Sequence, residues 1–290
     1  MSHDPRSVRR LFALAKAVSF TPAYSTAFDP KQLELLEALL PMDDITPEWA
    51  WGGATGRGVK VAVVDSGVDA DHPIIAGRVA GYTAITVSRT DELSYDDAPH
   101  EDASGHGTAC AGIILDIAPD CQLYSVRVMG KMGGKGAALV AGIRWVIDHR
   151  IHVANLSLGT TKRFFFGELH ALTDEAYFNH VTLVTAANNF PIPSFPCEYA
   201  SVVSVGSHAT NDPFLYYYNP APPTEFGAFG IDVPCAWKGG GISKVTGNSV
   251  AAPHITGIVA RVLEKHPSLT VFQVKAILRA LAANVARSAA

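Results

Sequence analysis

Short apolar runs alternate with amphipathic stretches along most of this chain. Five runs rich in Val, Ile, Leu and Ala have the length of buried strands, and they cover residues 59–64, 123–128, 153–157, 181–186 and 201–205. Between and after these runs, apolar residues recur at helical spacing. That spacing predicts helices over residues 107–115, 136–149, 168–179, 250–265 and 271–284, the last with a capping box formed by Thr270 and Gln273.

The alternation of strands and helices favours a parallel sheet covered by helices on both faces. We therefore predict an α/β fold of three layers, with a mostly parallel central sheet, for residues 43–290. No internal repeat or low-complexity linker divides this region, which argues for a single domain. In such folds ligands lie beyond the carboxyl ends of the strands, so candidate functional residues are expected directly after strands.

The first part of the chain, residues 1–42, has a different pattern and is predicted to form a helical N-terminal extension. Asp29 and Pro30 precede an amphipathic run over residues 31–40, which gives that run a cap and a proline at its first helical position. An earlier helix is expected over residues 7–18. Two roles stay open: a structural arm that packs on the main domain, and a regulatory or inhibitory arm.

Composition narrows the class of protein. Only 17% of the 290 residues are charged, which suits a sheet buried on both faces. The net charge of -4 provides no basic field for nucleic acid. No apolar stretch reaches the roughly 18 residues of a membrane span. We therefore expect neither nucleic acid nor a membrane as a partner.

Targeting and cysteine signals favour a cytoplasmic protein, with secretion as the alternative. Three arginines precede a short apolar run over residues 11–15, as in a signal peptide, but Lys16 interrupts that run. The cysteines form no CxxC motif, so free buried thiols are expected rather than a disulfide framework. The four cysteines are Cys110, Cys121, Cys197 and Cys235.

The most informative segment is Thr-Gly-Asn-Ser-Val-Ala-Ala-Pro-His, residues 246–254. It places Ser249 at the start of a buried helix, where free backbone N–H groups and the helix dipole favour developing negative charge. Near neutral pH a serine hydroxyl is protonated. It becomes a useful nucleophile when an imidazole and a carboxylate converge on it.

Asp65 and His106 are the candidates for these two partners. Asp65 follows the first predicted strand directly, and a Ser-Gly pair turns the chain at once. His106 stands between two glycines at the start of a predicted helix of small residues. Taken singly, each residue also fits a structural role, as an Asp that bonds a turn or as a core histidine. The other histidines, among them His72, His149 and His152, keep that structural interpretation.

Four segments together closely resemble the signature segments of the subtilisin-like serine proteases. They are residues 61–73, 105–112, 155–159 and 247–254, and the resemblance extends over about residues 43–284. It implies a subtilisin-like fold and a serine endopeptidase that works through an acyl-enzyme. In that enzyme Asp65 orients the imidazole, His106 is the general base, and Ser249 is the nucleophile.

The same resemblance assigns the donors for the oxyanion. Asn189, just after the strand predicted over residues 181–186, takes the place of the side-chain donor, beside the backbone N–H of Ser249. Asn188 stands where the family usually has Gly, and Asn248 stands where it has Thr. Because the Asn248 amide still carries a donor, we expect altered rather than absent oxyanion stabilisation.

The resemblance also implies a substrate-binding edge, formed by Ser157, Leu158 and Gly159. Its backbone would bind an extended peptide as an added strand. Together with Ala187 and Asn188, this edge is expected to wall the first side-chain pocket.

The loop over residues 190–195 is expected to close that pocket. No acidic residue lies in these segments, which argues against a preference for Lys or Arg. Lys162 and Arg163 follow the edge, and three phenylalanines at residues 164–166 come next, so this segment favours acidic or apolar side chains further along a substrate. A solvated turn and a core contact are the equal alternative.

Two departures from the family concern metals and thiols. The family often binds calcium in an insertion after the catalytic histidine. Here residues 111–119 form a short segment, and Ile74 replaces an acidic ligand, so the six to eight oxygens that calcium takes are missing. We predict that no metal or other cofactor is used and that a chelator leaves the melting temperature unchanged. Cys110 is expected beneath His106, which predicts sensitivity to mercurials.

Other functions stay open for the same residues. A catalytically silent peptide-binding protein would keep the fold, and a ligase or cyclase would transfer the acyl group to an amine instead of water. The lack of a calcium insertion and the short loop after Asn189 describe a trimmed form of the fold. This favours a dedicated processing protease that acts on a peptide or protein substrate.

Overall fold

A computed structural model describes residues 45–131 and 133–285 of the 290-residue chain. All of the candidate site residues lie in these ranges. The helical extension predicted over residues 1–42, its two helices and the boundary that follows it lie outside the described residues, so they stay predictions.

A nine-stranded sheet forms the centre of the described unit, in the order β10-β11-β9-β8-β7-β1-β4-β2-β3. Neighbouring strands are parallel except for the antiparallel pairs β10–β11 and β2–β3 at the two edges. The strands are β1 Lys60–Asp65, β2 Val79–Val87, β3 Leu93–Asp96, β4 Gln122–Arg127, β7 Val153–Leu156, β8 Thr182–Ala186, β9 Val203–His208, β10 Tyr217–Tyr218 and β11 Phe226–Phe229.

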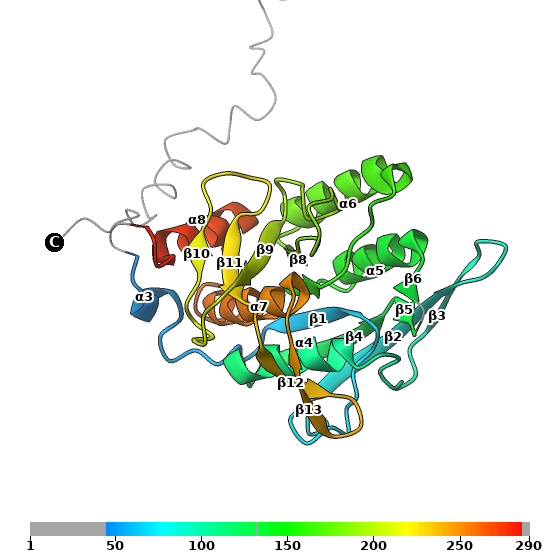
Figure 1. The fold of residues 1–290 in the computed structure, drawn as a ribbon. Coiled ribbons are helices and arrows are strands. Elements are labelled where there is room, and N and C mark those ends of the chain that lie inside the picture. Colours follow the sequence, from blue (N-terminus) through cyan, green and yellow to red (C-terminus); the bar gives the residue numbers. More distant parts are fainter. Residues whose placement is uncertain (1–44, 132, 286–290) are drawn as a thin grey trace, which may run out of the picture. The chain divides into compact units, whose positions relative to one another are not determined.

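Helices cover both faces of this sheet and complete three layers (Figure 1). One apolar core lies between the sheet and α4, α7 and α8, and the other lies between the sheet and α5 and α6. The helices are α3 Pro47–Trp51, α4 His106–Ile117, α5 Gly136–Asp148, α6 Phe166–Phe178, α7 Asn248–Lys265 and α8 Val271–Leu281, with a short 3-10 helix, η3, at Arg163–Phe165.

Every strand and helix predicted after residue 58 is confirmed to within a few residues. The central strands are easy to recognise because they are buried on both faces, and β1 shows this over Val61–Asp65. The capping box of Thr270 and Gln273 is also present at the start of α8. The strands that the pattern missed lie at the sheet edges or in hairpins, where burial is incomplete, and β2 with its mixed burial is the clearest case.

A two-stranded hairpin packs on the outer side of α4. It consists of β12 Val233–Trp237 and β13 Gly241–Val245. Val233 and Cys235 join a small apolar cluster with Ala109 and Ile113 of α4 and with Val250 of α7. This cluster holds together the two helices that carry His106 and Ser249.

Close backbone approaches bring the two site-bearing helices into place. A Cβ on Gly107 would overlap the carbonyl oxygen of Gly67, so only glycine lets the first turn of α4 pack against the loop that follows β1. A Cβ on Gly257 in α7 would lie 2.7 Å from the Cβ of Ile117 in α4. The first approach sets His106 beside Asp65.

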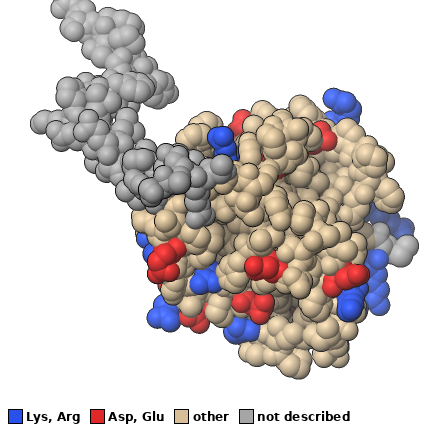
Figure 2. Space-filling view, turned by 60° about the vertical axis from the view of Figure 1, so that its left-hand side comes forward, with Lys and Arg blue, Asp and Glu red and all other residues tan. Residues whose placement is uncertain are grey.

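The cysteines, the helices and the surface charges of the described residues can be compared with what the composition predicts. All four cysteines are free and buried, as expected. No helix in the described ranges is long and apolar enough to cross a membrane. Figure 2 shows a face on which acidic and basic side chains are interspersed over a mostly uncharged surface. The absence of nucleic-acid partners stays a prediction.

Candidate active site

The candidate residues gather at the carboxyl edge of the sheet. Asp65 is the last residue of β1 and is fully buried. Ser157 follows β7, and residues 187–189 follow β8. Because β1, β7 and β8 are parallel neighbours, their ends bring these residues to one rim, as the predicted topology requires.

The carboxylate of Asp65 and the ring of His106 form a close pair. The His106 Nδ1 atom lies 3.0 Å from Oδ1 and 2.9 Å from Oδ2 of Asp65. The Asp65 side chain has no solvent exposure, whereas the His106 side chain is 21% exposed. The Asp65 carboxylate raises the pKa of His106 above its ordinary value, although burial of the ring acts in the opposite direction. The outer ring nitrogen, Nε2, is left to exchange a proton.

A second buried carboxylate, Asp102, was missed by the sequence reasoning. It accepts hydrogen bonds from the Ser66 hydroxyl (2.7 Å), from the backbone N–H groups of Ser104, Gly105 and Thr108 (2.8–2.9 Å) and from the Thr108 hydroxyl (2.7 Å). These bonds tie the turn after Asp65 to the start of α4. The crowding of small polar residues before His106 was the available signal.

Hydrogen bonding outweighs burial at Asp102. Burial alone would raise the pKa of this carboxyl, but the bonds from Ser66 and Thr108 lower it overall. Asp102 therefore stays ionised in the interior and holds the histidine loop in place.

Ser249 lies in the first turn of α7 and is half-buried, as predicted. Its backbone carbonyl accepts a bond from the Ser157 hydroxyl at 2.6 Å and a longer one from the Cys110 thiol at 3.6 Å. The predicted contact between the Ser249 hydroxyl and His106 is not made: among the described residues, the His106 ring bonds Asp65 and the Cys110 thiol only. Catalytic hydrogen bonds are often long in a free enzyme and tighten when substrate binds.

The Asn189 side chain converges on the same point as the Ser249 hydroxyl. A Cβ on Gly247 would lie 3.3 Å from Asn189 Nδ2 and 3.5 Å from Ser249 Oγ, so both atoms face one small space. The Asn189 Oδ1 atom accepts a bond from the Asn248 backbone N–H at 2.9 Å. Since the amide oxygen is held in this way, the NH₂ group remains available as a donor.

The expectation for Asn248 is wrong. Its Oδ1 accepts from the Ser207 backbone N–H at 2.8 Å, and its Nδ2 donates to the carbonyls of Ala187 and Asn188 at 3.2 and 3.0 Å. The whole amide thus links the ends of β8 and β9 and has no donor left for an oxyanion. Its role is to hold the segment that carries Asn189.

The edge formed by Ser157, Leu158 and Gly159 lies between two paired regions. Strand β7 ends at Leu156, and an antiparallel bridge joins Thr160 to Phe195. In the described part of the chain no strand pairs with residues 157–159, so their backbone can pair with an added strand. The Ser157 hydroxyl accepts a bond from buried Asn155 at 2.9 Å, which sets its bond to Ser249.

A pocket lies beside part of the segment expected to form the first substrate pocket. A pocket of about 330 Å³, called the β8 pocket below, is lined by Ala187, Asn188 and residues 190–194, as predicted. Its remaining wall consists of Cys197, Glu198, Pro223 and Thr224 rather than residues 157–159. It therefore contains an acidic residue, Glu198, which lies just beyond the loop considered in the sequence. The predicted lack of preference for Lys or Arg stays a prediction, because the lining alone does not test it.

Cys110 lies beside His106, as predicted, with its Sγ atom 4.0 Å from Nδ1. The potential ligand atoms of Asp65, His106 and Cys110 all lie within 4.8 Å of one another. Both oxygens of Asp65 already contact the His106 imidazole, so we interpret these residues as an Asp–His pair rather than as a metal site. Mercurial sensitivity, like independence from calcium, stays a prediction.

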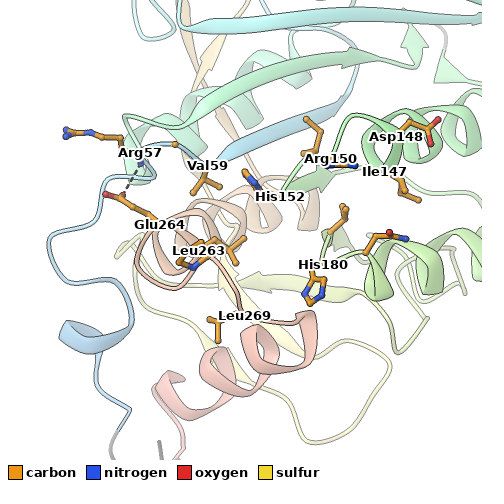
Figure 3. A pocket seen from close by; sticks show the side chains of 15 residues that line it. Arg57, Val59, Ile147, Asp148, Arg150, His152, His180, Leu263, Glu264 and Leu269 are labelled. Carbon is orange, nitrogen blue, oxygen red and sulfur yellow. Dashed lines mark hydrogen bonds between the residues drawn. The ribbon is translucent and has the colours of Figure 1, made fainter. Parts of the chain in front are cut away.

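A larger pocket lies at the opposite edge of the sheet, where β1, β7 and β8 begin. This amino-edge pocket has a volume of about 510 Å³ and is lined by Arg150, His152 and His180 among others (Figure 3). Glu264 at its rim bonds the backbone N–H of Arg57. His152 Nδ1 accepts the backbone N–H of Lys60 at 2.9 Å, which supports its structural interpretation.

Comparison with known proteins agrees with this geometry. Residues 56–289 match the family model of the Peptidase S8 subtilase family, and the chain belongs to the subtilase family. It is 31% identical over 252 residues to subtilisin E of Bacillus subtilis (strain 168), covering 81% of this chain and 63% of that protein. It is also 31% identical over 252 residues to subtilisin of Bacillus pumilus, covering 81% of this chain and 88% of that protein.

The fold has relatives among solved structures. A cold-adapted subtilisin-like serine proteinase superposes with a TM-score of 0.62 at 27% identity, over 77% of this chain and 81% of that one. The resemblance and the subtilisin-like three-layer α/β fold predicted from the sequence are thereby confirmed. The chain spans less than two thirds of the length of subtilisin E, so the activity of the whole protein is treated as a proposal.

Proposed function

We propose that this protein is a serine endopeptidase that hydrolyses peptide or protein substrates. The observation that carries the proposal is the buried Asp65 carboxylate held against His106, next to a serine in the first turn of a buried helix. A carboxylate in this position fixes the tautomer of the imidazole and stabilises the imidazolium. The helix start favours charge that develops on the attacked group.

Each residue takes one role in the proposed reaction. The Ser249 oxygen attacks the peptide carbonyl carbon while His106 Nε2 accepts the hydroxyl proton. The amide NH₂ of Asn189 and the backbone N–H of Ser249 bind the oxyanion. His106 then returns the proton to the leaving amine, and an acyl-enzyme remains. Water, deprotonated by His106, hydrolyses it and restores the serine.

A fluorophosphonate probe tests the chemistry directly. We expect it to label the protein at Ser249 and to leave Ser249→Ala unlabelled, while Ser243→Ala on β13 keeps normal labelling. A folded protein that resists the probe would be a silent peptide-binding protein and would contradict the proposal. Product masses from a peptide library identify hydrolysis, whereas joined peptides would indicate a ligase or cyclase.

Three narrower statements belong to this proposal: a dedicated processing role, a cytoplasmic location and the side-chain preference of the first pocket. A dedicated processing protease with a cytoplasmic location is supported by the trimmed loops and by the four buried free thiols. The first pocket is proposed to have no preference for Lys or Arg, and Glu198 in the wall of the β8 pocket is the residue whose charge would oppose this. A cleavage map of a peptide library, compared with Glu198→Gln, measures that preference.

A further inference from the structure

A third pocket, called the β4 pocket below, lies beside Asp65 at the ends of β4 and β2 and has a volume of about 330 Å³. Two residues of its wall bond the segment that carries the site. The Val128 N–H donates to the Asp65 carbonyl, and the Ala103 N–H donates to the Ser66 carbonyl, both at 2.8 Å. Arg127, the partner of Asp65 across β1 and β4, also lines it. The β4 and β8 pockets therefore flank the site along one edge.

The charged side chains that line the β4 pocket are both cationic. The positive charge of Lys135 is balanced by an ion pair, because its Nζ lies 3.1 Å from the Asp91 carboxylate. Arg127 is half-buried, and its Nη1 donates to the Glu101 backbone carbonyl at 3.4 Å. None of the described carboxylates forms an ion pair with Arg127. Its guanidinium therefore keeps donors for an incoming anion.

A second segment with basic residues packs next to Lys135 through one of its aromatic rings. Lys162 and Arg163 begin the η3 segment, and the ring of Phe165 in that segment packs so closely on Gly136 that a Cβ there would overlap it. Gly136 directly follows Lys135. The η3 segment, with two basic residues at its start, thus packs beside the residue that follows Lys135, although the chain as a whole has a net charge of -4.

We propose that the β4 pocket is a subsite that binds an acidic side chain of the peptide substrate, and that Arg127 selects this side chain. The proposal rests on the proposed protease function. Strands β7, β1 and β4 are neighbours, so the end of β1 and then the end of β4 are the next positions along the edge from a peptide bound at residues 157–159. A carboxylate there receives charge-assisted bonds from the guanidinium, and a neutral amide of the same shape does not.

Matched peptides test this subsite. Pairs of fluorogenic peptides differ only by Glu or Gln at one position, and the position is moved one residue at a time along both sides of the cleaved bond. We expect one position at which kcat/KM for the Glu peptide exceeds that for the Gln peptide by about tenfold at low salt. Raising the ionic strength of the unaltered protein should shrink this ratio, because the Arg127 charge is only half-buried.

Two variants identify the residue responsible. Arg127→Gln should bring the Glu/Gln ratio at that position close to one, and Arg127→Glu should produce a preference for Lys over Gln. The matched control is Arg57→Gln, at the opposite edge of the sheet, which should keep the preference of the unaltered protein. The ratio is measured within each variant, so a change in the amount of folded protein does not affect it.

The outcomes separate this proposal from the proposed function. Cleavage and fluorophosphonate labelling with a Glu/Gln ratio near one at every position would overturn the subsite and leave the protease intact. A ratio that Arg127→Gln leaves unchanged would also overturn it. Neither cleavage nor labelling would refute the proposed function, and the subsite with it.

Discussion

The amino edge of the sheet holds the larger pocket, about 510 Å³, whereas the carboxyl edge holds the candidate catalytic residues. The polar side chains at the amino edge, such as Arg150, His152 and His180, are exposed (Figure 3). At the carboxyl edge Asp65 and Asp102 are 0% and 4% exposed. Burying a carboxylate is costly unless other groups bond it, so the fold has to supply those bonds.

The surroundings at the two edges also shift the pKa of a histidine in opposite directions. At the amino edge, partial burial of the His152 ring and then the charge of Lys60 lower the pKa of this histidine. At the carboxyl edge, the Asp65 carboxylate raises the pKa of His106. Of these two histidines, His106 alone has a carboxylate positioned to stabilise its charged form. Pocket volume alone would select the amino edge, whereas buried, mutually bonded polar groups identify the carboxyl edge as the candidate site.

Replacing the two histidines gives the largest contrast. His106→Ala should lower kcat by a factor on the order of 10⁶, a loss of the size measured for the histidine of another subtilase. His152→Ala should leave the rate of peptide hydrolysis unchanged. Steady-state kinetics with one fluorogenic peptide measures both variants. Equal losses in the two would contradict the assignment of the site to the carboxyl edge.

The two adjacent asparagines after β8 provide a second comparison, between two side chains at the carboxyl edge. Asn189→Ala should reduce kcat by about 10²–10³, a value measured for the equivalent donor in another member of this family. Asn188→Ala should have a small effect, because its Oδ1 accepts the Phe190 backbone N–H at 3.0 Å and faces the loop. If Asn188→Ala caused the larger loss of kcat, the two roles would have to be exchanged.

The aspartates of the two edges should differ in their contribution to stability. Asp102→Asn places an NH₂ group where five donors converge, and we expect it to lower the free energy of unfolding by about 2–4 kcal/mol. Asp148→Asn, exposed at the amino edge, should change it by less than about 0.5 kcal/mol. Urea unfolding monitored by circular dichroism measures both.

The pH dependence of that stability follows from the lowered pKa of Asp102. Its contribution is present above the ordinary carboxyl pKa and is lost as pH falls through the lower value of the folded state. Stability that rises on acidification below about pH 4 would contradict this account.

The smallest expected effect is a displacement of the pH–rate profile. The proposed base works as neutral imidazole, so activity falls as pH drops through the pKa of His106. Because Asp65 raises that pKa, the midpoint should lie above the ordinary value of roughly 6.5. Initial rates measured between pH 4 and 10 locate it. A rate that stays flat down to pH 4 would exclude His106 as the base.

The sequence by itself determined the features that depend on local pattern. Apolar runs revealed the central strands, because a strand buried on both faces consists mostly of apolar residues. The motifs around Asp65, His106 and Ser249 were readable because each is a short segment at a strand end or helix start. Their parallel order then brought them to one edge.

Only the tertiary structure decided how polar groups are shared between distant segments. Asn248 looked like an oxyanion donor, but β8 and β9 use its whole amide. Glu198 became a pocket residue, and Asp102 became the centre of a buried network, through contacts that no local pattern encodes. A hydrogen-bonding side chain takes the partners that the surrounding fold presents, and those partners come from remote parts of the chain.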